Sequence, residues 1–223
     1  MSLPACVAQW PEQVTRQVMT ALYTPAADMH PEQAHALVPR ELWALPATVL
    51  SRGLAEPLND WPVELDGRKV EHRLALLPRT VLEQVAWNLG LLAHAASLRK
   101  LVLRSEVQAL SEQGLQDGDW QLALSAPRGP AHDMQTLAQA PLEQWPALMR
   151  HAGLLALRAL AASLGPVLGQ RLIWKLPTGL PTVGADQAPP SALVHLAYTP
   201  ASKQWSSHWD TCLSQIKPSG NPV

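Results

Sequence analysis

The chain has 223 residues, 47% of them hydrophobic, and a formal net charge of −1 from 17 basic and 18 acidic side chains. This length suits one large domain, since domains commonly hold roughly 100–200 residues. The balanced charge argues against general nucleic-acid binding, because phosphate recognition needs an excess of Lys and Arg. A net charge close to zero also favours association with other molecules.

Proline and acidic residues indicate where helices begin in the N-terminal region, residues 1–53. Proline is favoured in the first turn of a helix because its missing N–H would be unpaired there, and acidic residues complement the helix dipole. Three short helices are expected on this basis, at residues 11–22, 31–37 and 40–51. Pro46 should bend or end the third one.

Residues 55–73 are rich in turn-forming residues and predict an irregular segment. Residues 63–65 and 70–74 are candidates for a small β-hairpin across the Asp66-Gly67 turn. The polar connection at 116–132 contains a second candidate strand, at 120–125, where apolar and polar residues alternate.

Two long segments carry the strongest helical periodicity. Apolar residues recur at steps of three and four along residues 78–104 and again along 141–164. Gly90 lies inside the first segment, where Gly costs roughly 1 kcal/mol relative to Ala. Close approach of another helix would explain Gly90. A shorter helix at 106–112 should end at Gly114.

The remaining segments complete a mainly α fold. Residues 166–176 predict a short helix or a strand-like segment, and residues 176–190 a loop. Residues 200–217 predict an amphipathic C-terminal helix, followed by a disordered tail at 218–223. We therefore expect a single irregular helical domain over residues 1–217, with its core helices in residues 78–176.

Cysteine usage and the N-terminal residues favour a cytoplasmic location. Cys6 and Cys212 lie near opposite ends, so they predict neither a zinc site nor a disulfide framework. The N-terminus lacks the regions of a secretory signal. Residues 152–169 are the most apolar stretch, but Arg158 and Pro166 interrupt it, whereas a spanning helix needs about 20 continuous apolar residues.

No catalytic or metal-binding motif is evident in the sequence. The helical His-Glu-x-x-His zinc motif is absent. Ser97 and Lys100 match the Ser-x-x-Lys spacing of serine acyl-enzymes, but the companion motifs of those enzymes are missing. The chain is accordingly expected to be non-catalytic and to hold no cofactor or metal.

Tryptophan supplies the aromatic bulk, with nine Trp and no Phe. Trp is enriched at the energetic centres of interfaces as well as in cores. Trp87, Trp145 and Trp174 have core spacing. For the Trp residues of the peripheral segments, partner contact and simple packing are equally open; these residues are Trp10, Trp43, Trp205 and Trp209.

Two blocks of the chain carry a family resemblance. Residues 82–94 (LEQVAWNLGLLAH) lead into residues 98–103 (LRKLVL). This order resembles the central Leu-Gly-Leu helix and following paired basic residues of the SctK family (YscK and PscK) of type III secretion sorting-platform proteins. A second block, from 149–156 to 171–177, resembles the later helix of that family and its Arg-Leu…Leu-Pro ending. The likeness covers about half of the chain.

The resemblance implies a helical adaptor at the cytoplasmic face of the inner membrane, in the injectisome. SctK proteins join the cytoplasmic domain of the ring protein SctD to the SctQ pods, which connect through SctL to the ATPase SctN. The family has no known catalytic residues or cofactor.

Two sets of residues are candidates for partner contact. Arg99, Lys100 and Arg104 form a cationic helix face, for which simple solvation is the alternative. Trp205 and Trp209 share one side of the predicted C-terminal helix.

Two other functions stay open at this point. The first is an all-helical serine hydrolase that uses Ser97 and Lys100. The second is a peripheral membrane protein anchored by the Trp205/Trp209 helix. The polar face of that helix has only Lys203 and Lys217 to attract anionic lipid.

Overall fold

The computed structural model describes residues 9–55, 65–101, 103–127 and 136–217. The α-helices in these ranges are α1 (Glu12–Tyr23), α2 (Pro31–Leu37), α3 (Ala47–Ala55), α4 (Val70–Leu76), α5 (Arg79–Ala93), α6 (Ala95–Leu98), α7 (Arg104–Glu112), α8 (Asp117–Ser125), α9 (Thr136–Gln139), α10 (Trp145–Ser163), α11 (Pro166–Trp174), α12 (Ser191–Trp205) and α13 (Trp209–Leu213). Short 3₁₀ turns lie at Pro25–Asp28, Arg40–Leu42, Leu142–Gln144 and Ala185–Gln187. No strand occurs within the described ranges, so the mainly α fold class is confirmed.

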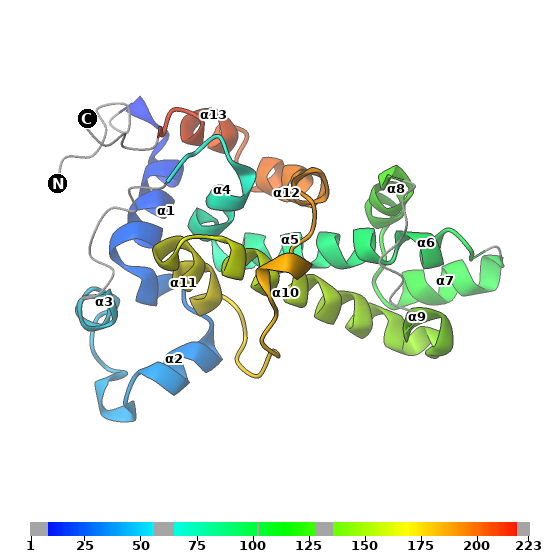
Figure 1. Ribbon diagram of the computed structural model, residues 1–223, viewed down its shortest axis with the longest axis horizontal. Helices are drawn as coiled ribbons and strands as arrows, with labels where there is room; N and C mark the ends of the chain where they lie inside the picture. The colour runs from blue at the N-terminus through cyan, green and yellow to red at the C-terminus, as the bar shows by residue number, and fades with distance from the viewer. Residues whose placement is uncertain (1–8, 56–64, 102, 128–135, 218–223) are drawn as a thin grey trace.

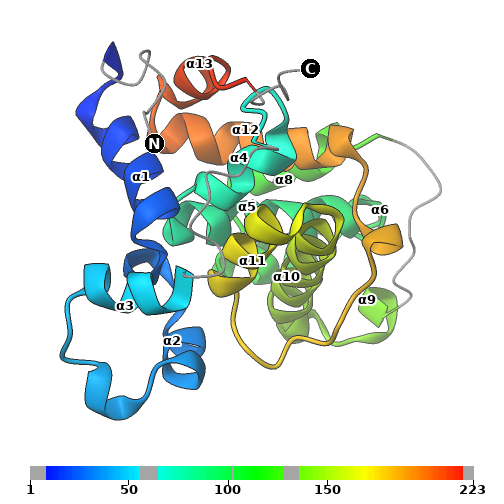
Figure 2. The same cartoon turned by 60° about the vertical axis from the view of Figure 1, so that its left-hand side comes forward.

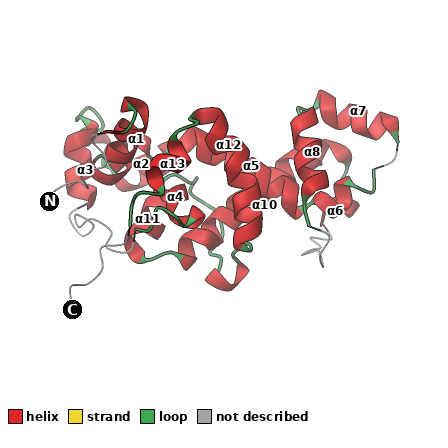
Figure 3. Ribbon diagram, turned by 90° about the horizontal axis from the view of Figure 1, so that it is seen from above, coloured by secondary structure: helices red, strands yellow, loops and turns green. Residues whose placement is uncertain are grey.

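The helices form an elongated body (Figure 1). Helices α1–α3 lie at one end and α6–α8 at the other, and the view from above shows the same order (Figure 3). The tail at 218–223, expected to be disordered, lies outside the described residues.

The core is built around α5 and α10, which pack against each other along much of their length. Helices α12 and α8 also contact α5, and α11 contacts α10 and α4. A Cβ on Gly90 of α5 would lie only 1.9 Å from the carbonyl oxygen of Met149 in α10. The expected close approach at Gly90 is therefore confirmed.

Proline marks several helix boundaries as expected. Helix α1 follows Pro11, α2 begins at Pro31, α5 follows Pro78 and α11 begins at Pro166. Pro46 separates the 3₁₀ turn Arg40–Leu42 from α3, so the expected third helix is split there. Gly114 follows α7 with a φ of 106°, the left-handed conformation that Gly adopts readily beyond a helix C-terminus.

The two β-structure predictions are wrong for the described residues. Residues 63 and 64 lie outside the described ranges, but Val70–Leu76 is helix α4, whose Val70 and Leu74 lie one turn apart on a buried face. The second candidate strand belongs to α8, which begins with a capping box between Gln116 and Asp119. This start signal outweighs the local alternation of apolar residues.

Two helix boundaries also differ from the prediction. The long segment 78–104 is interrupted: α5 ends at Ala93, α6 at Leu98, and Arg104 opens α7. The single C-terminal helix predicted at 200–217 is instead two helices: α12 begins at Ser191 and ends at Trp205, and α13 spans Trp209–Leu213. The buried face of α12 continues on both sides of Pro200. Pro200 has no N–H to donate to the carbonyl four residues earlier, and the helix tolerates this loss.

Candidate functional site

The N-terminal helices are fastened to the body by a buried ion pair. Lys175, at the end of α11, places Nζ 2.9 Å from Oδ2 of Asp28, and its side chain is 3% exposed. Nζ also donates to the carbonyl oxygen of Leu77. Asp28 in turn accepts from the backbone N–H of Arg79, at the first turn of α5, and from Nε2 of Gln17 in α1. Asp28 thus joins α1, α5 and α11.

Burial changes the ionisation of the two cations beside this joint. Desolvation lowers the pKa of Lys175, and the charge of Asp28 partly opposes this shift. Desolvation also lowers the pKa of Arg171 to about 10, partly offset by Tyr23. Arg171 donates through Nη1 to the carbonyl oxygen of Ala21 at 2.7 Å. Both cations therefore hold the N-terminal helices in place and are not exposed to a partner.

The predicted cationic face divides into one structural residue and two exposed ones. Arg99 donates from Nη2 to the carbonyl oxygens of Ala123 and Leu124, at 2.9 and 3.2 Å, and to that of Ala126. These carbonyls lie at the end of α8, where helical partners run out. Arg99 thus acts as a C-terminal cap of α8 while it stays partly exposed, and its role in partner contact stays a prediction.

Lys100 and Arg104 are exposed, and neither forms an ion pair within the described ranges. The two most exposed of the large apolar side chains described belong to the same end of the molecule: Leu103, which precedes Arg104, is 59% exposed, and Leu124, near the end of α8, is 64% exposed. The four residues form what we call the basic end: Lys100, Leu103, Arg104 and Leu124. Exposed Leu next to unpaired cations is suited to a partner surface that is apolar and acidic.

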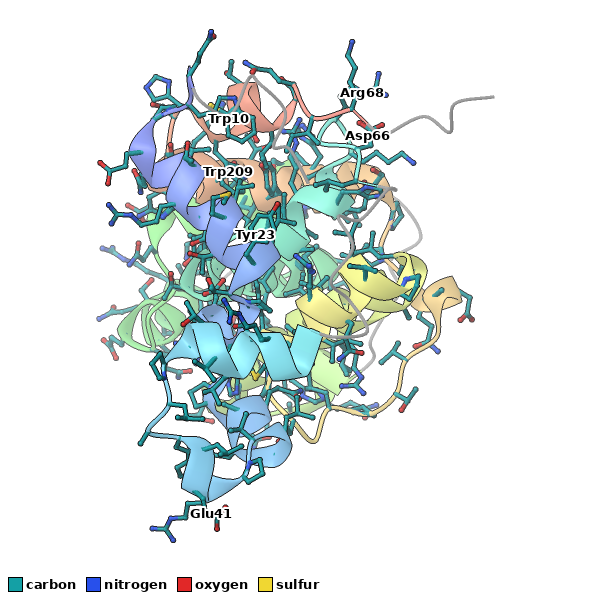
Figure 4. All side chains as sticks on the ribbon, turned by 90° about the vertical axis from the view of Figure 1, so that its left-hand side faces the viewer. Trp10, Tyr23, Glu41, Asp66, Arg68 and Trp209 are labelled. Carbon is teal, nitrogen blue, oxygen red and sulfur yellow. The ribbon has the colours of Figure 1, made fainter. Side chains whose placement is uncertain are left out.

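The C-terminal tryptophans do not form an exposed pair. Trp209 is 0% exposed and belongs to the core, so its prediction as a partner contact is corrected. Trp205 is half-buried and packs edge-on against Trp209, with ring centroids 4.9 Å apart. Figure 4 shows Trp209 beneath α1, with Trp10 nearby. Trp10 donates through Nε1 to Oε1 of Gln215 and so ties α1 to the chain after α13.

A second exposed apolar surface lies at the opposite end. Residues 31–55, which we call the N-terminal lobe, project from the body as α2 and α3 (Figure 2). The lobe contains five of the eight large hydrophobic side chains that are exposed in the described chain: Leu37, Leu42, Trp43, Leu45 and Val49. The periodicity of apolar residues in the sequence could not have revealed this surface, because Leu, Trp and Val residues at helical spacing are normally assigned to a core.

A cleft of about 610 Å³ opens over α5 between α10, the turn before α8 and the segment after α11. At its wall Trp87 donates through Nε1 to Oδ1 of Asp119 at 3.0 Å, and Cζ of Arg150 lies 5.9 Å from the centre of the Trp87 ring. Trp87 and Asp119 are therefore hydrogen-bonded to each other, and Arg150 lies over the Trp87 ring. The described lining residues include no hydroxyl or thiol that is hydrogen-bonded to a His or a carboxylate.

Four observations on the described residues bear on the hydrolase, metal and membrane alternatives. Lys100 N donates to Ser97 O, but no hydrogen bond joins their side chains there. No group of three or more His, Cys, Asp or Glu residues is arranged to hold a metal ion in the part of the chain that the structure describes. Trp209, proposed for a lipid anchor, is buried. None of the described helices combines the length and apolar character needed to cross a bilayer.

Comparison with protein-family models, with curated proteins and with solved structures finds no match to this chain.

Proposed function

We propose that the chain is a cytoplasmic adaptor of the SctK type, which bridges the SctD ring and the SctQ pods of a type III secretion injectisome. The sequence blocks at 82–103 and 149–177 support this proposal by their resemblance to SctK proteins. Through SctQ the adaptor would connect to SctL and the ATPase SctN. It would be required for secretion and would act at the inner membrane without catalysing a reaction.

The observation that carries the proposal is the separation of two partner-type surfaces on one rigid body. The basic end and the N-terminal lobe lie at opposite ends of the elongated molecule (Figures 1 and 3). Each exposes large apolar side chains that a monomer usually buries. A protein that joins two others needs two such surfaces, placed so that both partners bind at the same time.

The tight packing between these ends supports a mechanism of rigid-body bridging. Helices α5 and α10 run through the middle of the body, and their contact leaves no room for a Cβ at Gly90. The buried Asp28–Lys175 pair fixes the N-terminal helices on this body. A rigid adaptor fixes the distance between its partners and loses little entropy when it binds them.

The test is co-purification with the two partners. A tagged chain would be isolated from cells that contain both partners, from cells that lack SctD, and from cells that lack SctQ. Because separate surfaces are involved, each partner should be recovered even when the other is absent. Failure to recover either partner from cells that contain both would reject the proposal.

A matched pair of double variants tests the basic end. Lys100→Glu combined with Arg104→Glu should remove one partner and keep the other, with an unchanged melting temperature. Lys203→Glu combined with Lys217→Glu makes the same change of net charge at two other exposed lysines and should keep both partners. Equal loss with both double variants would mean that net charge, and not the basic end, controls binding.

A further inference from the structure

The cleft of about 610 Å³ over α5, which we call the central cleft, has the form of a groove. Four side chains of α5 line it at steps of three and four residues: Thr80, Glu83, Gln84 and Trp87. Steps of this size place all four on one face of the helix. A stripe of α10, from Pro146 to Leu157, lines the cleft as well. The groove therefore follows the two core helices, and it belongs neither to the basic end nor to the N-terminal lobe.

The length of the groove suits a short stretch of extended chain. The lining from residue 146 to residue 157 spans about 16 Å, because a helix rises about 1.5 Å per residue. An extended chain rises about 3.3 Å per residue, so about five residues fit along this length. The volume of the cleft also lies within the range of ligand sites in proteins.

The edges of the groove carry polar side chains that can pair with a peptide backbone. Thr80 and Gln113 are exposed, and neither makes a side-chain hydrogen bond in the described ranges. A hydroxyl and an amide each donate and accept, as the N–H and C=O groups of an extended chain require. A helical ligand satisfies its own backbone and binds in an apolar groove. The lining therefore favours an extended peptide over a helix.

The two carboxylates of the lining are already engaged. Glu83 forms an ion pair with Arg79 at 2.6 Å. Asp119 accepts through Oδ1 from Nε1 of Trp87 at 3.0 Å and through Oδ2 from the backbone N–H of Gln116 at 2.9 Å. Neither carboxylate is thus left to attract a cationic ligand.

Two of the three basic side chains of the lining are engaged too. Lys175 pairs with Asp28, and Nδ1 of His30 accepts from the backbone N–H of Glu32 at 3.3 Å. The third, Arg150, is exposed, and its guanidinium makes no ion pair or hydrogen bond to any residue that the structure describes. Arg150 is therefore the charged lining residue whose donors are free for a ligand.

The position of Arg150 suits a carboxylate near the middle of the groove. Its Cζ lies 5.9 Å from the centre of the Trp87 ring, and the hydrogen bond to Asp119 holds that ring. Residue 150 also lies near the middle of the lining from 146 to 157. A guanidinium placed in this way loses little entropy when it forms two parallel N–H···O bonds with a carboxylate.

We propose that the central cleft binds an extended peptide segment of about five residues, with an Asp or Glu near its middle. The carboxylate pairs with Arg150, and the peptide backbone bonds to Thr80 and Gln113. The half-buried Leu154 and Pro146 contact the side chains that flank the acidic residue. This peptide is a partner beyond the two that the proposed adaptor function requires. The proposal is therefore tested on the purified chain, without SctD or SctQ.

The experiment is binding to an array of immobilised pentapeptides. Each spot has one fixed residue at the centre and a mixture of residues at the other four positions. The fluorescently labelled chain should be retained about tenfold better where the central residue is Asp or Glu than where it is Asn or Gln. Equal retention of acidic and amide spots would overturn the proposal.

Variants of α10 show whether Arg150 causes this preference. Arg150→Gln should lose the preference for an acidic centre, and Arg150→Glu should shift it to Lys or Arg. Arg158→Gln makes the same change of charge on the same helix, at a residue that does not line the cleft, and should keep the preference. Melting temperatures would check that each variant is folded. A preference that survives Arg150→Gln, or that Arg158→Gln removes equally, would reject the assignment.

Nuclear magnetic resonance of the ¹⁵N-labelled chain locates the bound peptide. On titration with the best-retained pentapeptide, the indole N–H signal of Trp87 should shift, whereas that of Trp43, in the N-terminal lobe, should stay in place. Trp87→Phe and Trp43→Phe assign the two signals. A peptide that leaves the Trp87 signal unchanged at about 1 mM would not occupy the central cleft.

A competition experiment separates a peptide site from a site for any small carboxylate. N-acetylglutamate carries the same carboxylate but lacks the neighbouring peptide groups, so it should compete at least about a hundredfold more weakly than the pentapeptide. Equal competition would show that the cleft recognises a free carboxylate, and the peptide proposal would then be wrong.

Discussion

Gly90 of α5 and Gly153 of α10 lie against each other's helix backbone at the centre of the core. A Cβ on Gly90 would lie 1.9 Å from the carbonyl oxygen of Met149, and one on Gly153 would lie 1.7 Å from that of Ala86. The Cβ position of Gly153 is also only 3.1 Å from Gly90 N. Each glycine therefore makes room for the other helix, and the two helices come closer than side chains would allow.

Replacing either glycine by Ala should destabilise the protein. The added methyl meets backbone atoms, which cannot move aside as a flexible side chain can. Overpacking of this kind costs about 1–3 kcal/mol or more, which outweighs the gain of roughly 1 kcal/mol in helix propensity. Urea unfolding should show the loss for Gly90→Ala and for Gly153→Ala.

Gly118 provides the matched control for this prediction. It lies in the first turn of α8, and nothing lies within 4 Å of its Cβ position. Gly118→Ala should leave stability unchanged or raise it by up to about 1 kcal/mol. Equal effects at the three glycines would contradict the close approach of α5 and α10.

The helical framework was predictable wherever a proline boundary and an apolar stripe coincide. Pro31 and Pro166 open α2 and α11, and Gly114 follows α7. Prediction failed where two local patterns compete. Residues 120–125 alternate like a strand, but the capping box between Gln116 and Asp119 starts a helix.

The candidate site was less predictable than the helices, because exposure is a tertiary property. The sequence indicated that Lys100 and Arg104 could meet a partner, but it could not show that Arg99 caps α8, a segment more than 20 residues away. Leu103 and Leu124 are apolar residues of the kind that usually lies in a core, but both are exposed. Only the three-dimensional arrangement separates these roles.

Removing the guanidinium of Arg99 should lower stability, whereas removing the charge of Lys100 should not. Arg99→Ala leaves three carbonyls at the end of α8 without their charged donor, at a cost of about 1–2 kcal/mol. Lys100→Ala changes an exposed side chain and should stay within about 0.5 kcal/mol. Thermal melting of the two variants distinguishes them, and equal melting temperatures would show that Arg99 is not a cap.

Removing one partner of the Asp28–Lys175 pair should lower the free energy of unfolding far more than replacing both partners by uncharged residues. Asp28→Asn keeps an acceptor for Arg79 N but leaves the buried Lys175 without its counter-charge, at about 3–5 kcal/mol. Adding Lys175→Met removes the isolated charge, so the double variant should be more stable than Asp28→Asn alone. Urea unfolding of the single and double variants completes the cycle. A double variant as unstable as the sum of the singles would show that the two residues do not interact.

His94 should make the protein less stable as the pH falls below neutral. The residue is 3% exposed between α5 and α6, and desolvation lowers its pKa from 6.5 to about 4. Above pH 6.5 the imidazole ring is mainly neutral in both the folded and the unfolded chain, so the contribution of His94 to the free energy of unfolding does not change with pH. Between pH 6.5 and 4 the unfolded chain binds a proton that the folded chain does not, which should cost roughly 1–3 kcal/mol across this window.

The measurement is the free energy of unfolding between pH 4 and 7.5 for the unmodified chain, His94→Gln and His208→Gln. Other groups titrate in the same range, so the informative quantity is the difference between chains at each pH. In His94→Gln the free energy of unfolding should fall less steeply between pH 6.5 and 4, because the contribution of residue 94 is removed. His208→Gln, at an exposed site, should keep it. Parallel curves for all three chains would mean that His94 accepts its proton equally well when folded, and burial would then not be the controlling factor at this position.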